Sequence, residues 1–510
     1  MILLSVTLFL PLVGFLVLLL TPRDKPQAVR AIALGTAVAA FVCSVALLGL
    51  YNRDEAGFQL AANWPWIDTP AIRFHIGIDG LSVWLVLLTT LLTPISILVS
   101  WRPIATRVKE FYLFFLLMEF GLIGVFIALD LFLFYVFWEV SLVPMYFLIG
   151  VWGHERRVYA AVKFFIYTTV GSLMMLAAII YLYTRTGTFD YTALIAMTAS
   201  GQLALTGLEE ALLFGAFFLA FAIKVPLFPL HTWLPDAHVE APTAGSVMLA
   251  SVMLKMGCYG LIRFCLPLFP RASHEYAPWI VALAITGIIY GALVALVQPN
   301  MKKLVAYTSV SHLGFVILGI FTFTQYGLDG AVYQMLNHGI STGALFVLVG
   351  YLYERRHSLE IADYGGVAAV APWLAIAFSV TSLASMGLPA LNNFVGEYLI
   401  MQGTAFVSMR WTALAAVGVI LSAAYLLWLY QRVFYGDTPE AVRAHVTDMV
   451  PREWAAIVPL IVMMVWMGVY STSFLPPISR TTADILDRTH VGVVVRVQNT
   501  MPAAEVADAR

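Results

Sequence analysis

The sequence has few charged residues for its length. Of its 510 residues only 11% are charged, whereas 61% are hydrophobic, and a soluble domain carries about a quarter charged residues. The net charge of −1 provides no basic surface for a polyanion. These proportions exclude a soluble globular protein and predict an all-α protein that crosses a membrane many times.

Motifs for redox and nucleotide chemistry are also missing. The three cysteines, Cys43, Cys258 and Cys265, lie in apolar runs without a CxxC pair, which excludes an iron–sulfur cluster or a disulfide framework built by this chain alone. Neither GxxxxGKS/T nor a strand-linked GxGxxG occurs, so ATP hydrolysis and dinucleotide binding are not expected. The N-terminus lacks a basic n-region and an A-x-A cleavage site, so we interpret it as a retained first helix.

Apolar stretches long enough for a membrane span, about 20 residues, occur fourteen times. They are expected at residues 2–20, 28–50, 78–100, 111–129, 131–152, 160–183, 209–234, 241–266, 277–297, 303–323, 329–353, 370–407, 411–435 and 453–471. The one extended connection outside the membrane is 51–77, and the tail from about 477 is expected to be polar and poorly ordered. No stretch is long enough for a separate soluble catalytic domain.

Lysines and arginines are concentrated in the connections after odd-numbered spans, for example Arg156-Arg157, Lys302-Lys303 and Arg355-Arg356. Because positively charged loops stay in the cytoplasm, these connections are expected to be cytoplasmic. Both termini are then expected on the outer, periplasmic side.

Two of the expected spans cannot be continuous helices. Prolines between Val225 and Pro235 interrupt the seventh span, and Gly387-Leu-Pro389 interrupts the twelfth. Because the breaks are an odd number of spans apart, spans four to eight and nine to thirteen are predicted to be inverted five-helix repeats. The expected domains are residues 1–110 (first three spans), 111–266 (first repeat), 277–436 (second repeat) and 437–510 (last span and polar C-terminal tail).

Ionisable residues inside these spans are functional candidates, because a charge in the bilayer costs ~3 kcal/mol or more. Glu139 lies within the fifth span and Lys224 immediately before the first break. A nearby carboxylate would keep the lysine protonated, so the two are a candidate switch; the alternative for Glu139 is a protonated helix–helix hydrogen-bond donor. Lys255 lies in the middle of the eighth span, too central to snorkel, and is the strongest candidate for a proton carrier.

Two histidines and a second glutamate extend this set. His312 and His338 lie mid-span among Ser, Thr, Asn and Gln neighbours. Either histidine alone is more typical of packing, but two on adjacent spans favour a hydrated proton relay. Glu397 follows the second break and is either a helix-capping carboxylate or the terminal group of an outward proton route.

Other polar residues are weaker candidates. The acidic and histidine residues that follow the first break are His231, Asp236, His238 and Glu240. We expect them on the side of the even-numbered connections, exposed to water and in an accessory role. Glu119 and Asp130 are weaker still, and Asp130 is expected to cap a helix.

Together these motifs resemble the antiporter-like subunits of respiratory complex I (NADH-quinone oxidoreductase), which share ancestry with the large subunits of Mrp-type cation/proton antiporters. The resemblance depends on Glu139, Lys224-Val-Pro226, His231-Thr-Trp233-Leu-Pro235-Asp236-Ala-His238, Glu240-Ala-Pro242, Lys255, Tyr307-xxxx-His312-x-Gly314 and Asn337-His338. It runs over nearly all fourteen spans and implies fourteen helices with two inverted five-helix repeats.

The resemblance also implies roles for the buried residues. It assigns Glu139 and Lys224 as a coupled ion pair, Lys255 as the central proton site, His312 as a bridging histidine, His338 as an axis histidine and Glu397 as the outward terminal residue. Quinone reduction elsewhere would drive protons from cytoplasm to periplasm. Flavin (FMN), iron–sulfur clusters and quinone would belong to partner subunits, with no cofactor in this chain.

The expected partners are other membrane-arm subunits, especially the L-type and N-type antiporter-like subunits, together with membrane lipids and no nucleic acid. In those two types the second broken helix usually bears a lysine where this chain has Glu397, which favours the third type. The absence of a mitochondrial-type presequence favours the inner (plasma) membrane of a bacterium. A subunit of an Mrp-type Na⁺/H⁺ antiporter and a structural scaffold remain alternatives, and whether protons or sodium ions move stays open.

Overall fold

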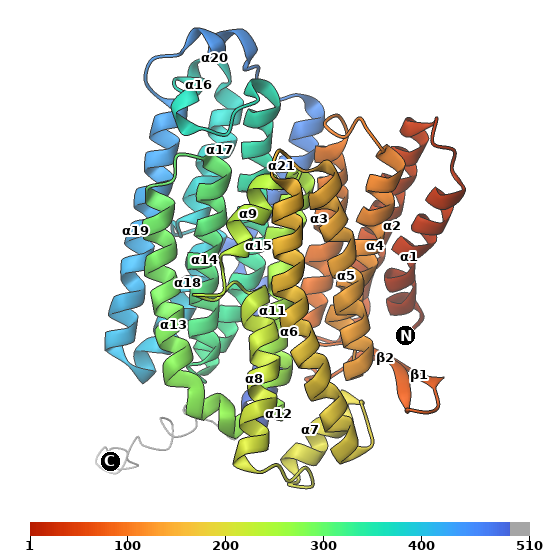
Figure 1. Ribbon diagram of the computed structural model, residues 1–510. Helices are drawn as coiled ribbons and strands as arrows, with labels where there is room; N and C mark the ends of the chain where they lie inside the picture. Colours follow the sequence, from red (N-terminus) through yellow and green to blue (C-terminus); the bar gives the residue numbers. More distant parts are fainter. Residues whose placement is uncertain (490–510) are drawn as a thin grey trace, which may run out of the picture.

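A computed structural model describes residues 1–489 and shows long helices that run in one common direction through the molecule (Figure 1). Its unbroken long helices are α1 (Ile2–Leu20), α2 (Pro26–Leu50), α3 (Ser82–Ser100), α4 (Val108–Ile127), α5 (Leu131–Trp152), α6 (Arg157–Thr186), α13 (Pro270–Leu296), α14 (Met301–Ile320), α15 (Gln325–Arg356), α19 (Met409–Phe434) and α21 (Pro451–Val469). With the segment Thr243–Leu268, they make twelve candidate membrane spans in the described chain. Two interrupted spans complete the fourteen expected, and the all-α polytopic class is confirmed.

Both predicted breaks occur. The seventh span consists of α8 (Gly207–Lys224), a non-helical turn and α9 (Trp233–Glu240). The twelfth consists of α17 (Pro372–Ser385), a second turn and α18 (Asn392–Val407).

Asparagines satisfy the backbone at the second break. Nδ2 of Asn393 donates to the carbonyl of Ser385 at 3.1 Å, and Nδ2 of Asn392 donates to the carbonyl of Asn337 at 3.0 Å. Irregular backbone at membrane depth requires such partners. The two broken spans cross in opposite directions, as inverted repeats require, while the repeats and the four-domain division stay predictions.

The eighth span contains two π turns that the sequence did not predict. These are η1 (Leu249–Met253) and η2 (Leu261–Cys265), which alternate with α10 (Thr243–Met248), α11 (Leu254–Gly260) and α12 (Leu266–Leu268). A π turn leaves carbonyl groups outside the regular hydrogen-bond ladder and is frequent at functional sites. The whole of this span is buried inside the bundle.

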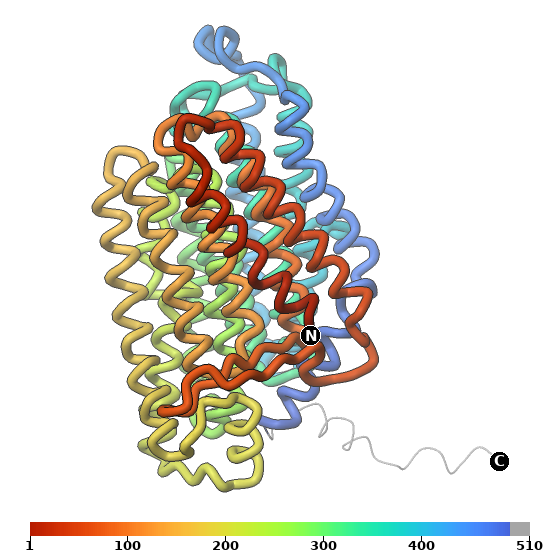
Figure 2. The backbone as a smooth tube through the Cα atoms, turned by 90° about the vertical axis from the view of Figure 1, so that its right-hand side faces the viewer, coloured from red at the N-terminus to blue at the C-terminus, as the bar shows by residue number. Residues whose placement is uncertain are grey.

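The connection 51–77 is not a plain loop. It contains strand β1 (Gln59–Ile67), which pairs antiparallel with β2 (Ile72–Ile78) in a register that places Trp64 opposite Phe74. The hairpin lies across the end of the bundle at which α1 begins, beside the short helix α7 (Tyr191–Ala199) (Figures 1 and 2). We refer to this end as the hairpin end.

The expectation of a poorly ordered tail from about 477 is wrong for its first part. Residues Leu475–Arg488 form helix α22, which is amphipathic: Ile478 and Ile485 lie on its buried face. Its spacing of apolar and threonine residues at three and four positions matches one helix face, which packs on the bundle. The remainder of the tail, 490–510, lies outside the described residues.

Short helices cover the opposite end, where α16 (Val367–Val370) and α20 (Glu440–His445) lie (Figure 1). The 3-10 turns are Ile361–Asp363 and Ser471–Ser473. The N-terminus and α22 both lie toward the hairpin end. That end is the predicted periplasmic side, and this orientation stays a prediction.

Close packing of α15 on α18 provides a test of the fold. A Cβ atom at Gly330 would lie 2.7 Å from the backbone nitrogen of Ile400 and 2.9 Å from the carbonyl oxygen of Gly396. Small residues allow helices in a membrane to approach closely, and overpacking costs about 1–3 kcal/mol. Gly330→Val is therefore expected to lower the thermal aggregation midpoint of the detergent-solubilised protein. The matched control is Gly215→Val on α8, where an added Cβ atom meets nothing within 4 Å; equal midpoints for the two variants would contradict this packing.

Candidate functional site

Lys255 lies on α11 with its side chain fully buried. Its Nζ atom donates to the carbonyl oxygen of Ala250, in η1, at 2.6 Å. The same nitrogen lies 2.6 Å from Nδ1 of His338 on α15. Within the described chain no carboxylate lies within 4.0 Å of this ammonium. A lysine held in this way, without a counter-ion, is suited to giving up a proton to the imidazole beside it.

A second contact joins α14 to α18. Nδ1 of His312 lies 2.8 Å from Oε1 of Glu397, and both side chains are buried. The same carboxylate oxygen accepts a hydrogen bond from Nε2 of Gln334 at 3.1 Å. Because Glu397 lies inside α18 and not at its first residue, it is not a helix cap. The structure instead makes it the acceptor of an imidazole.

The two contacts lie next to each other. The rings of His338 and His312 are 5.9 Å apart between centroids. Nε2 of His338 is buried and has no hydrogen-bond partner in the part of the chain that the structure describes. One bridging water or a small ring rotation would connect the two imidazoles. The structure thus brings Lys255, His338, His312 and Glu397 together in one line, which we call the proton line.

The predicted pair of Glu139 and Lys224 is not closed in this structure. Lys224 is the last residue of α8 and is 1% exposed. Its ammonium faces the rings of Trp138 and Phe164, 5.6 and 5.2 Å from their centroids, and it has no hydrogen-bond partner among residues 1–489. No oxygen of Glu139, on α5, lies within 4.0 Å of it. Two aromatic faces hold this cation instead.

The prediction for the polar residues after the first break is wrong in two respects. They lie on the side of the odd-numbered connections, since the backbone nitrogen of His154, after the fifth span, donates to the carbonyl of Glu240 at 3.0 Å. His231, His238 and Glu240 are also buried, not exposed. The reason is that the chain continues across the bundle after the break, so that α9 packs between α6 and α14 and ends beside the connection that follows α5.

Some residues of this region were missed or underrated. Lys302 was counted as a loop charge, yet its ammonium is buried and donates to the carbonyl of Ala241. Asp236 forms an ion pair with Lys163 of α6 at 2.7 Å. Both oxygens of Glu119, on α4, are buried without a hydrogen-bond partner in the described chain. Lys302 lies at the edge of an apolar run in the sequence, which is compatible with a loop or with a buried position. Only the packing of the folded chain distinguishes the two.

A cavity of about 710 Å³ opens at the end of the bundle opposite the hairpin. It is lined by residues of the odd-numbered connections and by Glu240, with Arg156, His357 and Glu360 among them. Burial, with Lys302 nearby, lowers the pKa of His154 at this cavity to about 4, so this histidine is neutral near pH 7. Across residues 1–489 no group of three or more His, Cys, Asp or Glu side chains is arranged to hold a metal ion.

Comparison with known proteins defines the class first. Residues 128–423 match the family described as NADH:quinone oxidoreductase/Mrp antiporter, transmembrane. The structure is similar to a chain in respiratory complex I from Thermus thermophilus with bound NADH, with a TM-score of 0.85 and 35% identity over 95% of this chain and 99% of that one. A chain of the Mrp complex from Dietzia shares the fold, with a TM-score of 0.82 at 21% identity, covering 96% of this chain and 99% of that one.

Relatives that align over nearly the full length of this chain identify the subunit family within this class. Subunit M of NADH-quinone oxidoreductase from Rhodobacter capsulatus is 44% identical over 510 residues, which cover 98% of this chain and 99% of that protein. The same subunit from Rickettsia typhi is 43% identical over 477 residues, 92% of this chain and 96% of that protein. The chain therefore belongs to the subunit M family of NADH-quinone oxidoreductases.

The contact between His312 and Glu397 predicts a coupled effect on stability. Residues in contact typically show interaction energies of about 0.5–3 kcal/mol in a double-mutant cycle. His312→Ala and Glu397→Gln are therefore expected to destabilise less together than the sum of the single changes. Unfolding is followed by alkylation of the buried free thiols Cys258 and Cys265 across a denaturant series.

The matched control combines Glu397→Gln with His274→Ala. His274 stacks on Phe323, outside the proton line, so that this pair should be additive. Additivity of the His312 and Glu397 changes would show that the two side chains do not interact.

Proposed function

We propose that the chain is the proton-translocating membrane-arm subunit M of a bacterial NADH:quinone oxidoreductase. The single observation that carries the proposal is the proton line, in which ionisable groups from α11, α15, α14 and α18 lie in direct or near contact within the membrane. Since the chain belongs to the subunit M family, the driving reaction is electron transfer from NADH to quinone, which takes place in partner chains. This chain contributes the route for protons and no redox site.

The proton line defines a sequence of transfers. The ammonium of Lys255 gives a proton to Nδ1 of His338, which lies 2.6 Å away, and becomes a neutral amine. His338 releases a proton from Nε2 on the opposite edge of its ring, toward His312. His312 takes it at Nε2, which lies 3.4 Å from the hydroxyl of Tyr425 on α19, and passes the proton on Nδ1 to Glu397 across 2.8 Å. An imidazole that accepts at one nitrogen and donates at the other moves a proton without rotating far.

Uptake is assigned to the end opposite the hairpin. The cavity beside Glu240 lies at this end, and the buried His238 lies two residues before Glu240 in α9. Release follows Glu397 toward the hairpin end. We assign the cavity end to the cytoplasm and the hairpin end, with both termini, to the periplasm of a bacterial inner membrane.

Lys224 and Glu139 act as the switch in this proposal. When Glu139 moves to Lys224, the two charges offset each other; when they separate, as in this structure, the Lys224 cation raises the positive potential felt by Lys255 and favours proton release. One pKa unit corresponds to about 1.4 kcal/mol. Moving one charge against 100 mV requires about 2.3 kcal/mol, so a swing of about two units is sufficient.

FMN, iron–sulfur and quinone sites are assigned to partner subunits, and the L-type and N-type subunits are the proposed neighbours. The second candidate is a subunit of an Mrp-type Na⁺/H⁺ antiporter, which shares the fold. Full-length identity of 43–44% to subunit M proteins favours the oxidoreductase.

Purification of the assembly that contains this chain tests the proposal first. A tagged chain, extracted gently from native membranes, is expected to carry rotenone- or piericidin-sensitive NADH:quinone reductase activity with flavin and iron–sulfur signals. A particle of small membrane subunits without redox centres would favour the antiporter.

Lys255→Met tests the proton line itself. Loss of the ammonium removes the donor to His338, so the number of protons pumped per NADH by the reconstituted complex is expected to fall. The measurement is the quench of a pH-sensitive dye in vesicles, divided by NADH oxidation. Lys109→Met is the matched control, because Lys109 is half-buried at the start of α4, outside the proton line, and its ammonium donates to the carbonyl of Leu19 at 2.9 Å. A normal proton yield from Lys255→Met would favour a scaffold.

A further inference from the structure

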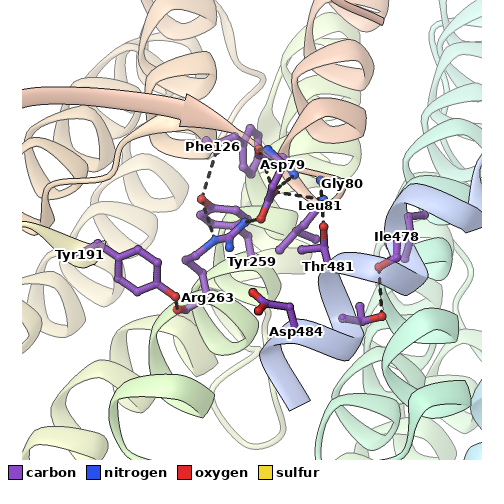
Figure 3. Close-up of polar contacts among 12 residues, drawn as sticks. Asp79, Gly80, Leu81, Phe126, Tyr191, Tyr259, Arg263, Ile478, Thr481 and Asp484 are labelled. Carbon is purple, nitrogen blue, oxygen red and sulfur yellow. Dashed lines mark hydrogen bonds and ion pairs between the residues drawn. The ribbon is translucent and has the colours of Figure 1, made fainter. Parts of the chain in front are cut away.

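A buried ion pair lies on the same helix as Lys255, in the direction of the hairpin end. Arg263, in η2, follows Lys255 by eight residues, or about 12 Å of helix. Its Nη2 atom lies 2.5 Å from Oδ2 of Asp79, which precedes α3 (Figure 3). Both residues are 2% exposed. The proton line uses neither of them.

Aromatic rings enclose the guanidinium. Its Cζ atom lies 5.0 Å from the ring centroid of Phe58 and 5.2 Å from that of Tyr259. Nε of Arg263 donates to the Tyr259 hydroxyl at 3.3 Å, and that hydroxyl donates to the carbonyl of Phe126, at the end of α4, at 3.1 Å. The arginine is therefore fixed by cation–π contacts and a short hydrogen-bond chain.

The carboxylate of Asp79 is also held in place by hydrogen bonds. Oδ1 of Asp79 accepts the backbone N–H groups of Leu81 and Ser82, at 3.2 and 2.9 Å, and the Ser82 hydroxyl at 3.0 Å. Each oxygen of the carboxylate thus has a partner, as a charge at this depth requires.

Helices from distant parts of the sequence cover the pair. The backbone nitrogen of Gly80 donates to Oγ1 of Thr481 on α22 at 3.0 Å. A Cβ atom at Gly80 would lie only 2.0 Å from the carbonyl oxygen of Pro477, so α22 packs directly on the backbone beside Asp79. From α7, the hydroxyl of Tyr191 donates to the carbonyl of Arg263 at 2.6 Å. Figure 3 shows these groups converging on the pair.

Within residues 1–489, Lys255 donates no hydrogen bond in this direction. Its hydrogen-bond partners are Ala250 and His338. The helix between Lys255 and Arg263, residues 256–262, is buried throughout.

We propose that Arg263 and Asp79 form an outward seal, a pair of positioning residues that stops the proton on Lys255 from leaving along its own helix. The fixed guanidinium repels a proton that approaches from Lys255, as an arginine does in channels that exclude protons. Asp79 holds the guanidinium in place. The proton on Lys255 is therefore released sideways to Nδ1 of His338. This inference rests on the proposed function.

The test uses the complete complex in vesicles, with an imposed pH gradient and no NADH. Arg263→Gln is expected to raise the passive proton leak by about tenfold, the change that loss of a barrier of one pKa unit produces. NADH:quinone turnover should persist while protons pumped per NADH decrease. A second variant, Arg263→Met with Asp79→Asn, removes both charges at similar volume and keeps a side-chain oxygen that can accept from Leu81 and Ser82. Neutral replacement of both partners of a buried ion pair is often tolerated, and this variant should leak as well.

Arg355→Gln is the matched control. Arg355 forms a buried pair with Glu453 at 2.6 Å at the opposite end of the bundle, so its loss should affect stability and leave the leak unchanged. Addition of Lys255→Met to Arg263→Gln should abolish the leak, because the route passes through that amine.

An unchanged leak in both seal variants would overturn the proposal. So would a leak that persists without Lys255, because the pair would then only maintain packing. Failure of the proposed function gives a different result. Normal pumping by Lys255→Met would contradict the proposed function. If Lys255→Met loses pumping but the Arg263 variants show no added leak, only the seal is contradicted.

Discussion

A charge inside the bilayer is stabilised by partners within the protein, and several such contacts join helices that are far apart in the sequence. Water and lipid headgroups are too far away to help at that depth. Arg263 therefore ties the eighth span to the start of α3. At the end of the bundle opposite the hairpin, the ion pair of Arg355 and Glu453 ties α15 to α21. The contact of His312 with Glu397 joins α14 to the broken twelfth span. Buried ionisable side chains therefore also stabilise the arrangement of the helices.

Much of the fold is predictable because few kinds of backbone structure are stable inside a membrane. A span needs about 20 apolar residues, and a proline inside it breaks the helix; both breaks were found in this way. The six candidate residues stood out because ionisable groups in apolar runs are costly. Four of them lie together in the structure. Glu139 and Lys224 do not touch, and no sequence pattern reports whether such a pair is open or closed.

What the sequence did not reveal depends on three-dimensional packing. The π turns beside Lys255 follow from the fit of one helix among its neighbours, since each departs from the regular ladder by a single residue. The burial of Lys302 and His238 results from the packing of α9 inside the bundle after the break, where Lys302 contacts the carbonyl of Ala241. Helix α22 was mistaken for a loose tail because its apolar face is narrow and its threonines, such as Thr481, find partners only in the folded bundle.

The position of α22 in the sequence has a consequence for biosynthesis. This helix follows the fourteenth span, so it is made after every helix that carries the proton line. Chains fold from the N-terminus onward during synthesis, and the backbone at Gly80 waits uncovered until Pro477 and Thr481 emerge. The hairpin end is thus covered by α22 only after all fourteen spans have been made. A ribosome that stops before Leu475 would leave in the membrane a nearly complete bundle that lacks its final cover.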